Sequence, residues 1–244
     1  MPRTLWGWEI TPGELRGWIL HLDEELLVVN KPAHVLCHPS KHGPWSSLVG
    51  ACREFLGAGR LHMPSRLDRE TSGVVLFARN AKLGSQLQRA VHHRQVRKVY
   101  HAILCGELRA SVAVDQPIGK DANSSVVMRR AVLPGGQAAQ TMFEPLGCGG
   151  GFTLVRITPL SGRLHQIRVH AHWLGYPVAG DKIYGPDERL FLEFIESGWN
   201  DRHAALLPFE RQALHASEWI SAPYHFTAPL PEEWRPLLEG MRIH

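Results

Sequence analysis

Short apolar runs separated by polar, turn-forming residues dominate the chain and predict its strands. Residues 26–30 form a continuous apolar run of the kind found in buried strands, and Lys31-Pro32 ends it because proline cannot donate to a strand ladder. Residues 74–78 form a second such run, which follows a charged loop. Further strands are expected over residues 98–104 and 212–219, and a hairpin over 138–146 and 152–159 around three consecutive glycines.

Helical spacing of apolar positions predicts the remaining elements. Helices are expected near residues 47–56, 81–94 and 187–197. Another helix follows the hairpin, where the apolar positions are Leu164, Ile167, Ala171 and Leu174.

On that last helix, a second face is polar. His165, Arg168 and His172 share it at spacings of three and seven residues, and Gly175 and Pro177 supply the stop signal. The interleaving of strands and helices lacks the regular rhythm of βαβ units. We therefore predict an α+β fold with a mixed, mainly antiparallel central sheet flanked by helices.

The length of 244 residues suits a single catalytic domain, which we place at residues 21–244. Residues 1–20 show no clear period and are interpreted as an N-terminal arm. No apolar run approaches the roughly 18 residues that suggest a membrane span, and the start lacks the apolar stretch of a secretory signal. We expect a cytoplasmic protein without membrane contact.

Composition adds two constraints. The four cysteines are far apart, which excludes a zinc ribbon or a redox pair and fits free thiols. The formal net charge is +4, and of the 27 basic residues six are lysine and 21 are arginine. Arginine stacks on bases and binds phosphate through two N–H groups, so this bias favours a nucleic-acid partner.

Three motifs carry more specific information. The first is Arg66-Leu67-Asp68-Arg69-Glu70-Thr71-Ser72-Gly73, and the second is Arg97-Lys98-Val99-Tyr100. The third runs from Gly162-Arg163-Leu164-His165-Gln166-Ile167-Arg168 through Leu174-Gly175-Tyr176-Pro177 to Gly180-Asp181. In this order and at this spacing, they resemble the RluA-type family of pseudouridine synthases, over roughly residues 22–238. Shorter supporting segments are Val29-Asn30-Lys31-Pro32 and Leu214-His215-Ala216.

The resemblance implies the pseudouridine synthase fold and an isomerase. Uracil leaves C1′ of its ribose, turns over and rejoins through C5, so no cofactor, metal or net water is needed. Asp68 matches the catalytic carboxylate, which either adds covalently or removes a proton beside the sugar carbon. By itself, an Arg-Leu-Asp-Arg segment is more often a surface turn with ion pairs.

Four further residues match substrate-binding positions of the family. Tyr100 matches a tyrosine that stacks on the uracil, and Arg168 matches the arginine that keeps the carboxylate ionised. Arg66 matches an arginine that helps to extrude the nucleotide, although a simple phosphate contact explains it equally well. Leu214 is a candidate apolar wall of the pocket, and core packing is an equal alternative.

Two positions depart from the family pattern. Ser65 stands where a histidine is common, and Leu164 where threonine or serine is common. Neither departure affects the proposed carboxylate, tyrosine or arginine.

Other signals are weaker. His165, His170 and His172 lack nearby acidic or cysteine partners, so we predict hydrogen-bonding histidines and no metal. His92 and His93 begin a basic run with Arg94, Arg97 and Lys98, which is either a solvated face or a phosphate contact.

The expected partner is structured RNA, with ribosomal RNA slightly favoured over transfer RNA, and a monomer suffices. Two rival functions are a non-catalytic RNA-binding or assembly factor and a hydrolase that releases free uracil.

Overall fold

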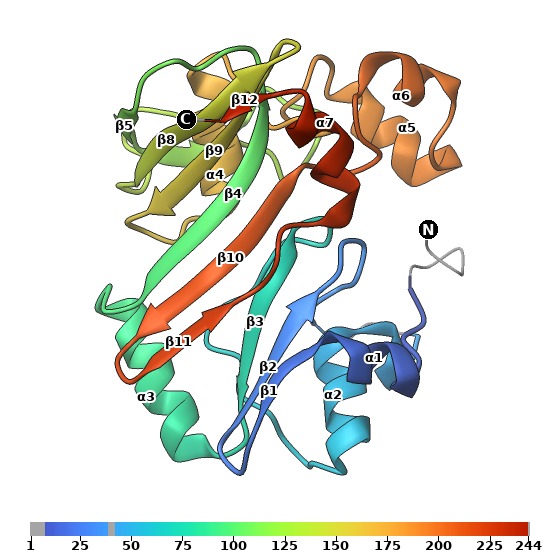
Figure 1. Cartoon of the computed structure of the whole chain (residues 1–244), viewed down its shortest axis with the longest axis vertical. Helices are drawn as coiled ribbons and strands as arrows, with labels where there is room; N and C mark the ends of the chain where they lie inside the picture. Colours follow the sequence, from blue (N-terminus) through green and yellow to red (C-terminus); the bar gives the residue numbers. More distant parts are fainter. Residues whose placement is uncertain (1–7, 39–41, 244) are drawn as a thin grey trace. The chain divides into compact units, whose positions relative to one another are not determined.

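The computed structural model describes residues 8–38 and 42–243, which divide into two compact units. The first unit comprises Met1–Lys98 and Ala216–Leu230, and the second comprises Val99–His215 and Pro231–His244. The chain passes between the units within strands β4 (Arg97–Cys105) and β10 (Leu214–Ser221), and again between Leu230 and Pro231. Figure 1 shows the elements of each unit.

The first unit combines a sheet with three α-helices. Its strands are β1 (Ile19–Leu22), β2 (Leu26–Lys31), β3 (Ser72–Ala78), β11 (Tyr224–Thr227) and most of β10. Its helices are α1 (Pro12–Trp18), α2 (Leu48–Leu56), α3 (Ala81–His92) and the 3-10 turn η1 (Pro44–Ser46). β1, β2 and β3 pair in antiparallel fashion, and β11 pairs with β10 in the same way.

Both faces of the β2–β3 pair are covered, which explains why these strands are apolar without alternation. Leu27, Val29 and Phe77 face a core cluster that includes Leu15 of α1 and Leu48 of α2. On the opposite face, the cluster combines strand residues with residues of α3: Leu26, Val28, Val74, Leu76, Leu83 and Leu87. Side chains of consecutive strand residues point to opposite faces, so burial on both sides requires a continuous apolar run.

The second unit is also built on antiparallel pairs. β9 (Phe152–Pro159) lies between β4 and β8 (Gln140–Gly149), and β8 also pairs with β5 (Val112–Asp115) and β12 (Arg242–Ile243). β6 (Ile118–Lys120) and β7 (Arg130–Val132) form a separate pair. The helical elements are α4 (Gln166–Trp173), α5 (Arg189–Ser197), α6 (Asp201–Leu206), η2 (Glu232–Trp234) and α7 (Arg235–Glu239).

The predicted fold class is confirmed, and so are the main predicted elements. Residues 1–7 of the predicted N-terminal arm lie outside the described residues, whereas residues 12–18 form α1, whose Leu15 is fully buried. The sequence patterns did not predict α1, β1, β5 or the β6–β7 pair, which are short and have little periodicity. No helix in the described ranges is long and apolar enough to cross a membrane.

A buried lysine at the end of β2 fixes the loop that precedes β3. The side chain of Lys31 is fully buried, and its Nζ donates to the carbonyl oxygens of Pro32, Val35 and Arg69 at 2.9–3.0 Å. Three directed bonds satisfy the three donors of an ammonium group, which is what burial of this charge requires. Lys31 therefore joins the segment after β2 to the loop at residues 66–71.

A glycine fixes the backbone where this loop enters β3. Gly73 of β3 has φ +112°, and a Cβ atom there would lie 2.2 Å from the carbonyl oxygen of Ala216 in β10. Both the backbone angle and the close approach exclude a side chain. The loop at residues 66–71 thus leads into a strand whose backbone is fixed against its neighbour.

We predict that Lys31→Met destabilises the protein by at least about 2 kcal/mol, because three carbonyl oxygens in or near the core lose their donor. Urea unfolding would measure this loss. Lys82→Met on the exposed surface of α3 is the matched control and should change the free energy of unfolding by less than about 0.5 kcal/mol. An equal effect of both substitutions would contradict the role of Lys31.

Candidate active site

Asp68 lies half-buried in the loop that Lys31 fixes. The residue before it, Leu67, packs against the core cluster of α1 and α2. The residue after it, Arg69, gives its carbonyl oxygen to Lys31 and donates from Nε to the carbonyl of His34 at 3.3 Å. Thr71 N–H closes a turn on the carbonyl of Asp68 at 3.2 Å. The backbone on both sides of this carboxylate is therefore held by side chains.

Arg66 is exposed at the start of the same loop, and its guanidinium bonds to Nε2 of His38. Burial and the adjacent charge of Arg66 lower the pKa of His38, so this imidazole is neutral at pH 7 and can accept the bond. The contact orients an otherwise mobile arginine beside the loop.

Tyr100 and Leu214 belong to one core cluster in the second unit. Tyr100 lies on β4 opposite Ile157 of β9, and its side chain is half-buried against that cluster. Leu214, at the start of β10, is only 4% exposed. Leu214 is packed within this cluster, whereas Tyr100 retains an accessible part.

Arg168 is the most firmly held candidate residue. Its Nε and Nη2 donate to the two carboxylate oxygens of Asp181 at 2.6 and 2.9 Å, and both side chains are buried. Asp181 also accepts the backbone N–H groups of Ile183 and Tyr184. Burial alone would raise the pKa of Asp181, but the charge and bonds of Arg168 and these two N–H groups lower it.

The backbone before Asp181 requires glycine. Gly180 has φ +76°, and a Cβ atom there would lie 2.1 Å from the carbonyl oxygen of Arg211. A substitution would displace the turn that aims Asp181 at Arg168.

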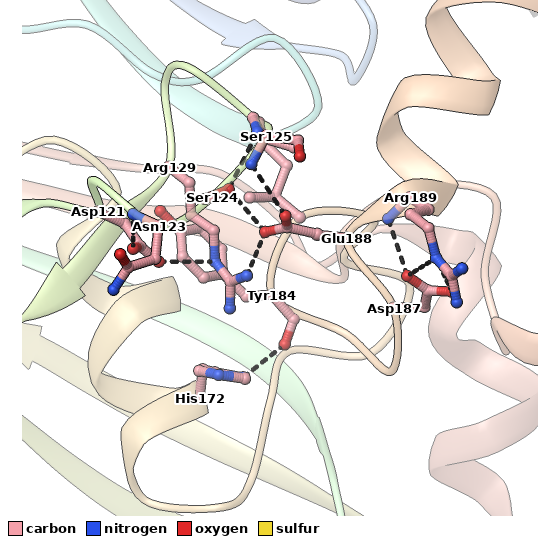
Figure 2. A network of polar contacts seen from close by, with 12 residues as sticks. Asp121, Asn123, Ser124, Ser125, Arg129, His172, Tyr184, Asp187, Glu188 and Arg189 are labelled. Carbon is pink, nitrogen blue, oxygen red and sulfur yellow. Dashed lines mark hydrogen bonds and ion pairs between the residues drawn. The ribbon is translucent and has the colours of Figure 1, made fainter.

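Tyr184 connects Arg168 to the rest of the second unit. The guanidinium of Arg168 lies over its ring at 5.0 Å from the centroid. Its hydroxyl accepts the N–H of Arg130 at 2.9 Å, which leaves its proton to donate to Nδ1 of His165 at 2.9 Å. Its carbonyl accepts from Nδ1 of His172, as Figure 2 shows. Burial raises the pKa of Tyr184 to about 12, so the hydroxyl stays protonated.

Glu188 attaches the segment between β6 and β7 to this network. In Figure 2 its carboxylate faces Ser124, Ser125 and Arg129. It accepts from Ser124 Oγ at 2.6 Å, from Ser125 N–H at 3.1 Å and from the guanidinium of Arg129. Arg129 in turn lies over the ring of Tyr184 at 5.7 Å. The β6–β7 segment therefore packs against the same tyrosine that supports Arg168.

The three histidines of the third motif serve as hydrogen-bonding residues. His165 and His172 bond to Tyr184, and His170 bonds to Thr141 at 2.8 Å and to the carbonyl of Gln116 at 3.0 Å. Within the described ranges, no group of three or more histidine, cysteine or acidic residues could hold a metal ion.

Two of the three residues on the polar face predicted for α4 are buried, and the third, His172, is exposed. Arg168 and His165 are at most 9% exposed, whereas Leu164, assigned to the apolar face, is 44% exposed and precedes the helix. Helical periodicity correctly placed His165 and Arg168 on one face. It could not show that these polar side chains are buried, which their ion pair and hydrogen bonds make possible. Sequence reasoning assigned no individual role to Lys31, Asp181 or Tyr184. Lys31 and Asp181 lie in segments that carry the family resemblance, whereas Tyr184 lies outside them.

We predict that Asp181→Asn lowers stability at neutral pH by several kcal/mol, because it leaves a buried guanidinium without its counter-charge. A lowered folded-state pKa adds stability above the unfolded value of 3.8, which is lost as pH falls further. The difference in unfolding free energy between wild type and variant should therefore shrink below about pH 4. A difference that stays constant down to pH 2.5 would contradict this origin.

Comparisons with known proteins identify the family of the chain. The family model described as RNA pseudouridylate synthase matches residues 25–173. The chain is 33% identical to ribosomal large subunit pseudouridine synthase D of Vibrio vulnificus, over 92% of this chain and 70% of that protein. It is 34% identical to the uncharacterized RNA pseudouridine synthase YjbO of Bacillus subtilis, over 91% and 75%.

A solved structure has the same fold. Human RNA pseudouridylate synthase domain containing 4 is 26% identical, has a TM-score of 0.73 and covers 95% of this chain and 96% of its own. The extent of these matches shows that the chain belongs to the RNA pseudouridine synthase family, whose members are isomerases that convert uridine in RNA to pseudouridine.

Proposed function

We propose that this enzyme modifies uridine in large-subunit ribosomal RNA, with Asp68 as its catalytic carboxylate. The observation that carries the proposal is the fixation of the Asp68 loop, since a nucleophile or base must be held in place before the substrate arrives. Several relatives are named as large-subunit ribosomal enzymes, which supports ribosomal over transfer RNA. We further propose that the enzyme acts as a cytoplasmic monomer.

The isomerisation requires one ionised carboxylate. The bond between N1 of uracil and C1′ breaks, the ring turns, and a bond forms between C5 and C1′. C5 loses its proton and N1 gains one, so the composition of the RNA is unchanged. Asp68 either adds to the substrate and is later released, or removes a proton beside C1′. A half-buried position suits both routes, because it removes part of the water that would otherwise compete.

Arg168 supports this reaction as an oriented hydrogen-bond donor. Its two bonds to Asp181 fix the plane of the guanidinium, and we assign this oriented group to the support of the reacting carboxylate.

Tyr100 and Arg66 are assigned to the substrate base. The accessible part of Tyr100 offers a ring for stacking, at about 1–3 kcal/mol for a base–aromatic contact. Arg66 is exposed and oriented by His38, which suits either nucleotide extrusion or a phosphate contact. Leu214 contributes as a member of the core cluster against which Tyr100 packs.

We predict that Asp68→Asn lowers the single-turnover rate of pseudouridine formation by at least about 10²-fold, as expected for a lost catalytic base or nucleophile. RNA affinity should stay within about twofold of wild type. Glu70→Gln in the same loop is the matched control and should keep most of the activity.

Three outcomes would contradict this assignment or the function. Full activity of Asp68→Asn removes Asp68 from the chemistry. RNA binding by wild type without any product identifies a binding or assembly factor. Loss of uracil, seen as a decrease in RNA mass, identifies a hydrolase, because isomerisation leaves the mass unchanged.

The substrate is identified by mapping pseudouridines in total RNA from cells with and without the gene. We expect a site in large-subunit ribosomal RNA to vanish with the gene and to return with wild type but not with Asp68→Asn. A site that vanishes from transfer RNA instead would overturn the ribosomal assignment and leave the isomerase activity intact.

A further inference from the structure

The stretch between Glu70 and Glu107 contains no acidic residue in 36 positions, yet it holds four arginines and two lysines. Three of these arginines lie near the end of α3 and the start of β4: Arg89, Arg94 and Arg97. Together with His92 and His93 they form what we call the α3 basic surface, and all five side chains are exposed. Figure 1 shows α3 leading into β4 at this end of the first unit.

The three arginines of this surface have no acidic partner among the described residues. Across the described ranges, the guanidinium groups of Arg89, Arg94 and Arg97 take part in no hydrogen bond or ion pair. By contrast, three exposed arginines elsewhere each pair with a neighbouring carboxylate: Arg109 with Glu107, Arg189 with Asp187 and Arg235 with Glu232. Unpaired like charges repel one another, so their retention at one place favours an anionic partner.

Stabilisation of the helix accounts for only part of this cluster. Cations in the last turn interact favourably with the negative end of a helix, which explains Arg89 and His92. Arg94 and Arg97 lie beyond the helix, and Arg94 has φ +58°, an unfavourable angle for a residue with a side chain. Their charges therefore need another explanation.

We propose that the α3 basic surface binds the phosphate backbone of the RNA substrate, outside the residues assigned to chemistry. The proposal rests on the proposed function for the identity of the polyanion. Arginine suits this role because its planar guanidinium can donate two bonds to one phosphate, and no base-edge discrimination is required. A backbone contact of this kind sets affinity and orientation and leaves the rate of the chemical step unchanged.

Two variants of equal net charge test the proposal. The first carries Arg89→Gln, Arg94→Gln and Arg97→Gln, and the second carries Arg109→Gln, Arg189→Gln and Arg235→Gln at positions that are 81%, 72% and 68% exposed. Each loses three positive charges, so only the location differs. Glutamine keeps helix propensity nearly constant and remains polar. Thermal melting checks that both variants fold, and an Arg94→Gln, Arg97→Gln double variant avoids α3 altogether.

The probe is a fluorescein-labelled RNA hairpin of mixed sequence. Its affinity for each variant is measured at several salt concentrations between roughly 50 and 200 mM. We expect the first variant to bind about tenfold or more weakly at the lower salt concentrations. Its slope of log affinity against log salt should be smaller by about two to three, since each lost phosphate contact removes about one unit. The second variant should bind like wild type.

Several outcomes overturn the proposal. Equal weakening in both variants means that net charge alone acts, and unchanged binding in the first variant means that this surface does not touch RNA. Loss of binding to vesicles of phosphatidylglycerol and phosphatidylcholine, with RNA binding intact, assigns the surface to a membrane instead.

Activity separates this proposal from the proposed function. At saturating ribosomal RNA, the first variant should form pseudouridine at the wild-type rate while needing more RNA for half-maximal rate. If wild type forms no pseudouridine, the proposed function fails, and the comparison of binding still decides the role of the surface.

Discussion

The buried ammonium group of Lys31 is the interaction on which the candidate site depends. A charge taken out of water must find partners, and those of Lys31 include three backbone carbonyls, one of which belongs to Arg69 beside Asp68. Because the buried charge needs these bonds, Lys31 holds the backbone of the loop in place. Leu67, in the core, and Thr71, bonded to the carbonyl of Asp68, complete the constraint. These contacts together hold the loop at residues 66–71 in one conformation.

The second unit solves a similar problem with a different pair of charges. Arg168 and Asp181 are buried together, and their two parallel bonds fix the plane of the guanidinium. Tyr184 then supports that plane through its ring and connects it to Arg130 and His165. The side chains that hold the candidate residues are themselves buried and bonded, which is the condition for a preorganised site.

Much of this architecture could be predicted from the sequence, for identifiable reasons. The β2 and β3 runs are apolar throughout because both faces are covered, and α3 has clear helical spacing, so periodicity identified them. The motif around Asp68 could be recognised because several segments occur in a fixed order. Short elements such as β5 and β7 offer too few residues for a period, and only the chain around them determines their structure.

The roles of the residues that support the site could not be predicted from the sequence, for a different reason. Nothing local distinguishes a lysine that is buried against carbonyls from one in solvent, so the role of Lys31 depends on contacts 38 residues apart. The same holds for Tyr184, whose ring, hydroxyl and carbonyl serve different partners. Helical spacing placed Arg168 on a polar face, and its burial became evident only with Asp181 in place.

The most direct test of the account is a crystal structure of the Asp68→Asn variant bound to an RNA fragment that carries the mapped uridine. The quantity to measure is the distance between the side chain at position 68 and C1′ of that uridine. The account predicts that the base has left its stack and that this distance corresponds to van der Waals contact, about 3–3.5 Å for reacting atoms. A target uridine that remains stacked, or one bound with C1′ far from position 68, would contradict it.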